Sequence, residues 1–269
     1  MANNLARALR ELVTMNNQKS HRGSDVAVPV GNKTSVAFSS RGALFGALKD
    51  HFVPVFVSAG QRVALNHGSS PLVCLLDTGM MMLTSSLDYD RRTVLALMFA
   101  GDFTSGSFAN PQGDVKLTAL LPSRYLAVTL SDFEKIISDN QHLVPLYSHS
   151  CARLVGRQTL QISSLSMLTC EQKLATLLVD LALNIGRPAN GGIQVDVPLS
   201  RRDIADYLAL NMDTVSRTMS QFKTEGLVAA VGRRHLVVLK PLDLILRTPL
   251  GKEVLELHKN AACAALFSK

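Results

Sequence analysis

The stretch LSRRDIADYLALNMDTVSRTMSQF, residues 199–222, predicts two short helices joined by a tight turn. Ser200 followed by Asp203 is typical of a helix N-cap, because each side chain can bond a backbone amide of the first turn. The helical pattern then breaks at Leu210 and Asn211, and Asp213 begins the second helix. Apolar residues recur at helical spacing on one face of each helix: Ile204, Ala205 and Leu208, then Val215, Met219 and Phe222. The pattern predicts a helix-turn-helix.

The outward face of the second helix has the chemistry of a DNA-reading surface. Arg217 can bond the O6/N7 edge of guanine, Asp213 can accept from the amino group of cytosine, and Ser216 is short enough to allow close approach. We therefore expect these three residues to read bases. The residues expected to contact the DNA backbone are Ser200, Arg201, Arg202, Thr214, Thr218, Arg233, Arg234 and His235.

Downstream, residues 226–239 predict two strands around a basic tip at Gly232–His235, which is the pattern of a wing. The wing strengthens the interpretation, since two short amphipathic helices alone occur in many enzymes. Upstream, residues 171–184 predict a helix that stops at Gly186. An exposed loop at 189–192 and a short strand at 193–197 should follow.

Residues 52–133 have a different pattern, with short apolar runs bounded by turn residues. The runs at 53–57, 71–76, 94–99 and 125–130 have strand length, and this spacing is typical of a β-sandwich or barrel. Glycines at the corners, where a positive φ costs glycine least, fit the same interpretation. They are Gly60, Gly79 and Gly101, the last followed by Asp102.

Between these parts, apolar residues at helical spacing predict one long helix over about residues 140–165. Such a helix needs a partner surface, which is either its own barrel or a second copy of the chain. We favour a parallel seam between two copies, because a lone helix between domains has little to bury against. The expected interface residues are Leu143, Tyr147, Leu154, Gln158, Ile162 and Leu165.

Composition is consistent with a DNA-binding protein of the cytoplasm. The chain has 269 residues and a net charge of +7, which favours polyanionic partners. Its four cysteines, Cys74, Cys151, Cys170 and Cys263, form no CxxC pair, which suits a reducing compartment. No signal peptide, membrane span or membrane partner is expected. No catalytic activity is expected either, because the sequence has no GxSxG, HExxH, P-loop or GxGxxG motif.

Over about residues 40–241 the chain resembles the CRP/FNR superfamily of bacterial regulators. The segment from Leu199 to Thr218 is similar to the FNR and FixK branch, in which the positions of Asp213, Ser216 and Arg217 read a TTGA-type half-site. Asp213 stands where the branch usually has Glu, and Ala209 where it usually has a turn glycine. The resemblance implies an α+β fold with an N-terminal cyclic-nucleotide-binding-like β-roll (jelly roll), a long dimerisation helix and a C-terminal winged helix-turn-helix. It also implies a homodimer on a near-palindromic promoter site in double-stranded DNA, and we expect RNA polymerase as a further partner.

The resemblance leaves the sensor's signal open, and no cofactor is expected. Relatives bind cyclic nucleotide with a Glu and an Arg after the Gly-Asp corner, but residues 101–116 contain neither and offer only Lys116. Iron–sulfur relatives use N-terminal cysteines, and residues 1–73 contain none. His67 and Cys74 are weak candidates for haem ligands, because a lone Cys in an apolar strand is usually a small buried hydrophobe. A redox switch at Cys170 or Cys151 stays open.

The expected domains are a helix and flexible arm at 1–38, a β-roll sensor at 39–135, the dimerisation helix at 136–166, the winged helix-turn-helix at 167–241 and a helical extension at 242–269. The predicted function is sequence-specific transcription regulation. The alternatives are the same regulator gated by an unidentified small ligand or by cysteine oxidation, and a barrel interaction module without DNA binding.

Overall fold

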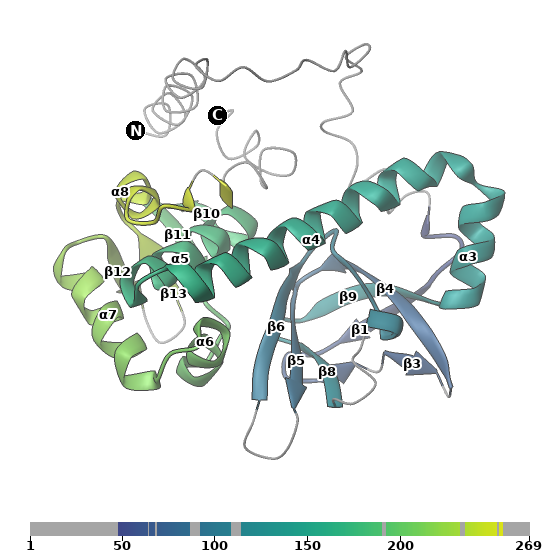
Figure 1. Cartoon of the computed structure of the whole chain (residues 1–269), viewed down its shortest axis with the longest axis horizontal. Coiled ribbons are helices and arrows are strands. Elements are labelled where there is room, and N and C mark those ends of the chain that lie inside the picture. The colour runs from purple at the N-terminus through teal and green to yellow at the C-terminus, as the bar shows by residue number, and fades with distance from the viewer. Residues whose placement is uncertain are drawn as a thin grey trace, which may run out of the picture.

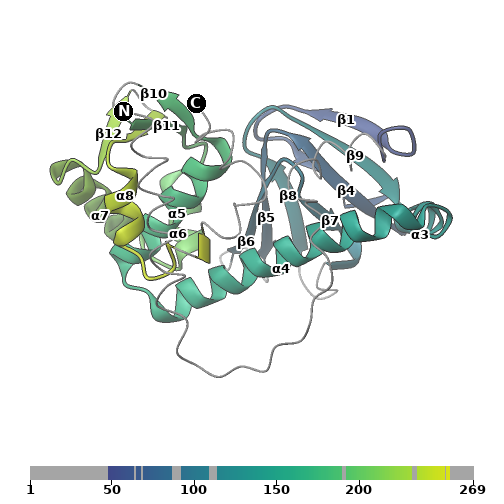
Figure 2. The ribbon, with the colours of Figure 1, turned by 90° about the horizontal axis from the view of Figure 1, so that it is seen from above.

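The computed structural model describes residues 48–63, 65–67, 69–86, 92–108, 114–189, 192–231, 235–251 and 253–254. A β-roll and a smaller mixed unit lie side by side, and the long helix α4 (Val144–Met167) runs across both (Figure 1). Seen from above, α4 follows one side of both units (Figure 2). The expected α+β architecture is thereby confirmed. The helix and arm expected at 1–38 and the extension beyond residue 254 lie outside the described residues.

The β-roll consists of two antiparallel sheets. The first has the order β1 (Val53–Val57), β9 (Ser123–Thr129), β4 (Ser70–Thr78) and β3 (Asn66–His67), with β7 (Phe103–Ser105) also paired to β4. The second has the order β2 (Arg62–Val63), β8 (Asp114–Ala119), β5 (Met80–Ser86) and β6 (Arg92–Phe99). The four apolar runs predicted as strands fall on β1, β4, β6 and β9, so that prediction is confirmed.

Glycine is required at the corner between β4 and β5. Gly79 has a φ of +96°, and a Cβ atom there would lie 2.1 Å from the hydroxyl oxygen of Ser123. Gly60 and Gly101 also have positive φ values, of 83° and 87°. The predicted corner glycines therefore occupy the backbone conformation that motivated the prediction.

Three apolar clusters hold the β-roll and its neighbours together. One lies between the two sheets and contains Cys74, Met81 and Met98. A second covers the outer face of the first sheet, where Phe133 of α3 (Leu130–Asp139) and Leu143 of the 3-10 turn Gln141–Leu143 pack on Leu75 and Leu126. Since side chains alternate along a strand, β5 sends Met81 into the roll and Met80 and Met82 outward.

The third cluster joins the β-roll to the C-terminal unit. Met82, Leu97 and Phe99, on the outer face of the second sheet, belong to one continuous cluster with Leu178 of α5 (Cys170–Ile185) and Leu208 of α6 (Arg201–Leu208). The two units thus share one apolar core.

The C-terminal unit contains the two predicted helices, α6 and α7 (Met212–Thr224), which pack on each other, and α7 also packs on α5. Its sheet has the order β10 (Arg187–Ala189), β11 (Gly192–Asp196), β13 (His235–Val238) and β12 (Val228–Val231), and α8 (Pro241–Leu246) follows. The helix predicted at 171–184 and the strand predicted at 193–197 are confirmed as α5 and β11.

The prediction of an exposed loop over residues 189–192 is wrong at both ends. Ala189 pairs with Gly192 at the end of a β10–β11 hairpin, so both residues belong to strands. Strand β10 lies at the edge of the sheet, where a proline such as Pro188 is tolerated.

Candidate nucleic-acid interface

The helix-turn-helix begins with the predicted capping box. The hydroxyl of Ser200 accepts from the backbone amide of Asp203 at 3.1 Å, and the carboxylate of Asp203 accepts from the amide of Ser200 at 3.0 Å. Helix α7 is capped by Asn211, whose side-chain oxygen accepts from the amide of Thr214 at 2.6 Å. These caps fix where both helices start, and therefore which residues of α7 face outward.

Ala209 forms the turn between α6 and α7 in the left-handed region, with φ 49° and ψ 52°. It is the one non-glycine residue with positive φ among the residues described. The turn has therefore kept the conformation for which glycine is usual, at a cost of roughly 1–2 kcal/mol for an L-residue.

Helix α7 presents the residues expected to read bases on its outer side. Asp213 and Arg217 are exposed and Ser216 is half-buried, while Val215 and Phe222 are buried against α5 and α6. The Ser216 hydroxyl donates to the carbonyl of Met212 at 2.8 Å, which leaves its oxygen free to accept. The arrangement is a polar stripe about one turn long, with a carboxylate at its start and a guanidinium one turn further on.

The residues expected to contact the DNA backbone differ in how exposed they are. Ser200, Arg201 and Arg202 are exposed at the start of α6, and Thr214 is half-buried in the first turn of α7. Thr218 differs, since it is buried on the inner face of α7 with 7% of its surface exposed. Helix α7 turns the position of Thr218 toward the core, beside Val215 and Phe222. Thr218 is therefore removed from the candidate interface.

The predicted wing is present as the β12–β13 hairpin, in which Val231 pairs with His235. Gly232, Arg233 and Arg234, which form its expected basic tip, lie outside the described residues. His235 is placed as the first residue of β13.

An arginine of the β-roll bonds directly to the helix-turn-helix. Arg92, at the start of β6, forms an ion pair with Asp203 of the capping box, and its Nε lies 3.5 Å from a carboxylate oxygen of Asp206. Burial alone would raise the pKa of Asp203, but hydrogen bonds from Ser200 and Arg92 outweigh it and hold the pKa below its ordinary value. The ion pair of Arg92 with Asp203 thus joins strand β6 of the β-roll to α6, the first helix of the helix-turn-helix.

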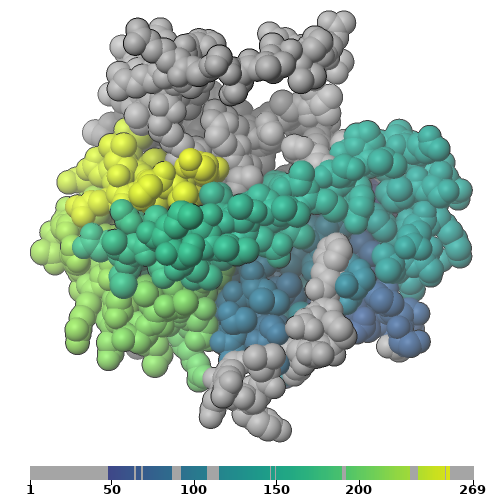
Figure 3. Space-filling model, in the orientation of Figure 1, coloured from purple at the N-terminus to yellow at the C-terminus, as the bar shows by residue number. Residues whose placement is uncertain are grey.

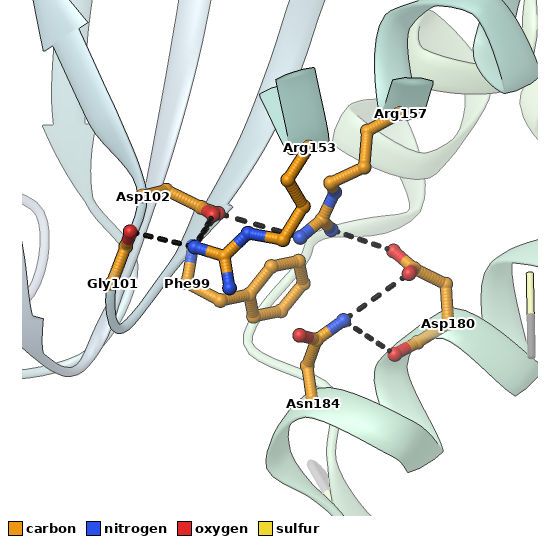
Figure 4. A network of polar contacts seen from close by, with 7 residues as sticks. All are labelled: Phe99, Gly101, Asp102, Arg153, Arg157, Asp180 and Asn184. Carbon is orange, nitrogen blue, oxygen red and sulfur yellow. Dashed lines mark hydrogen bonds and ion pairs between the residues drawn. The ribbon is translucent and has the colours of Figure 1, made fainter. Parts of the chain in front are cut away.

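A buried ionic network connects the Gly-Asp corner, α4 and α5 (Figure 4). Asp102 is 2% exposed and accepts from Arg153 at 2.8 Å, from Arg157 at 3.3 Å and from the amide of Phe99 at 2.8 Å. Arg157 also donates to Asp180 of α5 at 3.0 Å. Burial alone would lower the pKa of Arg157, but the carboxylates of Asp180 and Asp102 outweigh it and raise that pKa.

Two further contacts complete the network. The Arg157 guanidinium stacks 4.4 Å from the centroid of the Phe99 ring, and Asn184 donates to the Asp180 carboxylate at 3.1 Å. The sequence analysis did not single out Arg153, Arg157 or Asp180. A signal was present, because Arg153 and Arg157, one helical turn apart, are the only Lys or Arg residues between positions 144 and 167.

Helix α4 has one face on its own chain and one on the surface. Leu143 is 1% exposed in the core beneath α3, and the Tyr147 ring lies 5.0 Å from that of Phe133. Both residues were expected in a seam between two copies, but packing against the β-roll occupies them. Leu154 is half-buried, while Gln158, Ile162 and Leu165 are exposed.

Helix α4 runs along the front of the molecule in Figure 3, and its outer face carries a stripe of exposed apolar side chains. Val155 is 61% exposed and Ile162 67%, and they stand one heptad apart, with Leu165 on the same side. In the N-terminal half the stripe is shifted by one residue from the predicted one, because Val144 rather than Leu143 faces outward.

The residues considered for sensing lie in three separate places. Cys74 is buried in the roll, where burial raises the pKa of its thiol to about 12, so it is protonated and unreactive at neutral pH. Cys151 and Cys170 are half-buried in α4 and at the start of α5. Within the described part of the chain, no group of three His, Cys, Asp or Glu side chains is placed to hold a metal ion. No described helix is long and apolar enough to cross a membrane.

Comparisons with known proteins agree with this architecture. Residues 172–245 match the family described as the Crp-like helix-turn-helix domain. The chain is 30% identical to the transcriptional activator protein FnrL of Cereibacter sphaeroides over 195 residues, which cover 67% of this chain and 74% of that protein.

Solved structures share the fold. That of FixK2 from Bradyrhizobium japonicum has a TM-score of 0.61 at 22% identity, covering 73% of this chain and 97% of that one. A cyclic nucleotide-binding domain containing protein from Listeria monocytogenes gives 0.62 at 12% identity, covering 76% and 100%.

A β-roll joined by a long helix to a winged helix-turn-helix defines a DNA-binding transcription regulator rather than an enzyme. The chain belongs to the CRP/FNR family and is FNR/FixK-like.

Proposed function

We propose that the chain binds a TTGA-type palindrome as a homodimer, with α7 of each copy in the major groove. The observation that carries the proposal is the outward-facing stripe of exposed Asp213 and Arg217 with half-buried Ser216, on a helix whose other side is buried. A helix-turn-helix dimer places two such helices about one DNA turn apart, so that each reads one half-site.

In this proposal, Arg217 bonds a guanine edge and Asp213 accepts from a cytosine amino group, while Ser216 permits close approach. Ser200, Arg201, Arg202 and Thr214, at two neighbouring helix starts, contact phosphates. The basic tip at Arg233 and Arg234, with His235, adds sequence-independent contacts to the backbone.

The exposed stripe on α4 supports a seam between two copies. Val155, Ile162 and Leu165 recur with coiled-coil spacing on a face that the described residues of the chain leave open. Leu154 and Gln158 flank this seam. Two α4 helices in parallel would place the two DNA domains on one side of the dimer, as a palindrome requires.

Replacing Ile162 by glutamate is expected to break the dimer, because two carboxylates would face each other in a dry seam. The association of two copies should weaken at least tenfold, as measured by analytical ultracentrifugation. Leu246→Glu is the matched control, since it places the same charge at an exposed leucine of α8, away from α4. An Ile162→Glu protein that dimerises as tightly as Leu246→Glu would rule out this seam.

The relative FnrL is named a transcriptional activator, and we propose the same class of action here, with RNA polymerase contacted by the DNA-bound dimer. The described barrel residues suit no cyclic nucleotide in the usual mode, although 109–113 lie outside the described residues. Half-buried Cys151 and Cys170 keep oxidation as a second route of control.

The deciding experiment titrates purified, reduced, ligand-free protein against a duplex carrying a TTGA…TCAA palindrome and against a scrambled duplex, at one fixed moderate salt concentration. We expect selective binding, by about a thousandfold or more for a specific regulator. Equal affinity for both duplexes would contradict the proposed reading by α7. Fixed salt is essential, because the phosphate contribution changes steeply with ionic strength.

A further inference from the structure

Helix α6 is attached at both ends to parts of the chain outside the helix-turn-helix. It lies on the side of the C-terminal unit that faces β6 (Figures 1 and 2). Near its start, Asp203 pairs with Arg92 of β6. Near its end, the backbone carbonyl of Tyr207 accepts from the side-chain amide of Gln161 of α4 at 2.5 Å. The first helix of the helix-turn-helix is therefore bound to the β-roll and to the helix that carries the proposed seam.

Arg92 contacts two carboxylates of α6. Asp203 and Asp206 are three residues apart, so they lie on the same face of the helix. The guanidinium of Arg92 forms an ion pair with Asp203, and its Nε lies 3.5 Å from Oδ2 of Asp206. A single contact would let α6 turn about its axis. Two contacts one helical turn apart, made by one planar group, restrict both the tilt and the rotation of the helix.

The contact with Asp206 depends on both partners. Nε of Arg92 and Oδ2 of Asp206 are buried, and neither forms a hydrogen bond with any residue that the structure describes. Each atom therefore relies on the charge that faces it at 3.5 Å. Removing the guanidinium would leave a buried carboxylate oxygen uncompensated, which favours a movement of α6 that returns this oxygen to water.

The position of α6 determines the position of α7. Three residues, 209–211, separate the two helices, and Val215 and Phe222 of α7 are buried in the same cluster as Leu208 of α6. In this arrangement Asp213 and Arg217 are exposed. The contacts of Arg92 therefore hold α7 in an orientation that leaves its reading face open.

From these observations we propose that Arg92 determines the half-site spacing that the dimer accepts, because through Asp203 and Asp206 it holds each α7 at one distance and angle from the α4 seam. The inference rests on the proposed homodimer and palindrome. One added base pair moves a half-site by about 3.4 Å and turns it by about 35°. Two firmly held recognition helices cannot follow such a change, whereas loosely held ones can. Arg92 is thus a positioning residue, which acts on α7 without touching DNA.

The test measures the affinity of the full chain for three duplexes at one salt concentration. They carry the TTGA…TCAA palindrome, the same palindrome with one extra base pair between the half-sites, and a single half-site. The spacing preference is the ratio of the affinities for the first two duplexes. In Arg92→Met we expect this ratio to fall by about threefold or more, while affinity for the single half-site stays at the wild-type value. Methionine removes the charge but keeps an apolar stem beside Met82.

Asp206→Asn is the second variant, because it removes one carboxylate from the contact and leaves the capping box of Ser200 and Asp203 intact. It should also lower the spacing preference. Arg62→Met is the matched control, since it removes an equal charge from an exposed position on β2 of the roll and should keep the wild-type ratio.

Three results of the DNA titrations would overturn the proposal. The first is a wild type that binds both spacings equally well, and the second is an unchanged ratio in Arg92→Met. The third is an equal loss of affinity for all three duplexes with a salt dependence reduced by about one counterion, which would identify Arg92 as a phosphate contact.

Hydrogen exchange of the DNA-free protein tests the same role without the palindrome. The backbone amides of α6 should exchange faster in Arg92→Met than in Arg62→Met, while those of α5 keep the wild-type rate. Equal exchange in α6 would overturn the proposal even if the wild type selects the palindrome. A wild type that does not distinguish the palindrome from the scrambled duplex would instead contradict the proposed function, so the two failures are distinguishable.

Discussion

Arg217→Ala is expected to lower affinity for the TTGA palindrome by about tenfold to a hundredfold, which corresponds to ~1–3 kcal/mol for a bidentate base contact. Arg217 is exposed on α7, and the described residues give it no structural partner, so the change should leave the fold intact. Affinity should be measured by titration at fixed salt on both the palindrome and the scrambled duplex. The loss should be much larger on the palindrome, because a base contact carries the sequence preference.

The control for this prediction is Arg62→Ala, which removes an equal charge from β2 of the roll. Arg62→Ala should lower the affinity for the palindrome and for the scrambled duplex slightly and equally, because it changes only the long-range electrostatic field. If Arg217→Ala kept wild-type selectivity, the register assigned to α7 in the groove would be incorrect. A uniform loss on both duplexes would instead assign Arg217 to a phosphate.

Asp102→Asn is expected to destabilise the protein by about 3–5 kcal/mol, the usual cost of removing one partner from a buried ion pair. The asparagine can still accept from the amide of Phe99, but Arg153 and Arg157 lose the carboxylate between them while remaining buried. Urea unfolding measures the effect as a lower midpoint with an unchanged slope.

Asp132→Asn provides the comparison, since its carboxylate is exposed beside Lys135 at the start of α3. Exposed pairs contribute little, and this change should stay within about 1 kcal/mol of the wild type. Equal effects of the two substitutions would show that Asp102 contributes no more to stability than an exposed carboxylate does. A large effect of Asp102→Asn alone supports the network as the link between corner, long helix and DNA domain.

Most of the C-terminal unit could be predicted because its signals are local. The capping box at Ser200 and Asp203, the buried positions Val215 and Phe222, and the stop at Gly186 each depend on residues within one or two helical turns. The four strands predicted in the roll were found for the same reason, since length and flanking turn residues mark them without knowledge of their partners.

The parts that could not be predicted depend on contacts between distant segments. Leu143 and Tyr147 have the spacing of a dimer seam, but whether that face meets a second copy or the roll is decided by α3 and β7. Thr218 and Thr214 differ in burial because α5 covers one side of α7. Arg92 bonds to Asp203 across more than a hundred residues of sequence, and no local sequence pattern predicts such a pair.

The outward methionines of β5 have a consequence for how the protein unfolds. Met80 and Met82 are buried in the same cluster as the helices of the DNA domain, so neither unit can open without exposing apolar surface of the other. The roll and the winged helix-turn-helix should therefore lose their structure in one cooperative transition. A fragment containing only the DNA domain would expose the side chains that Met80 and Met82 now cover, so it would be less stable and more prone to aggregate than the same residues within the whole chain.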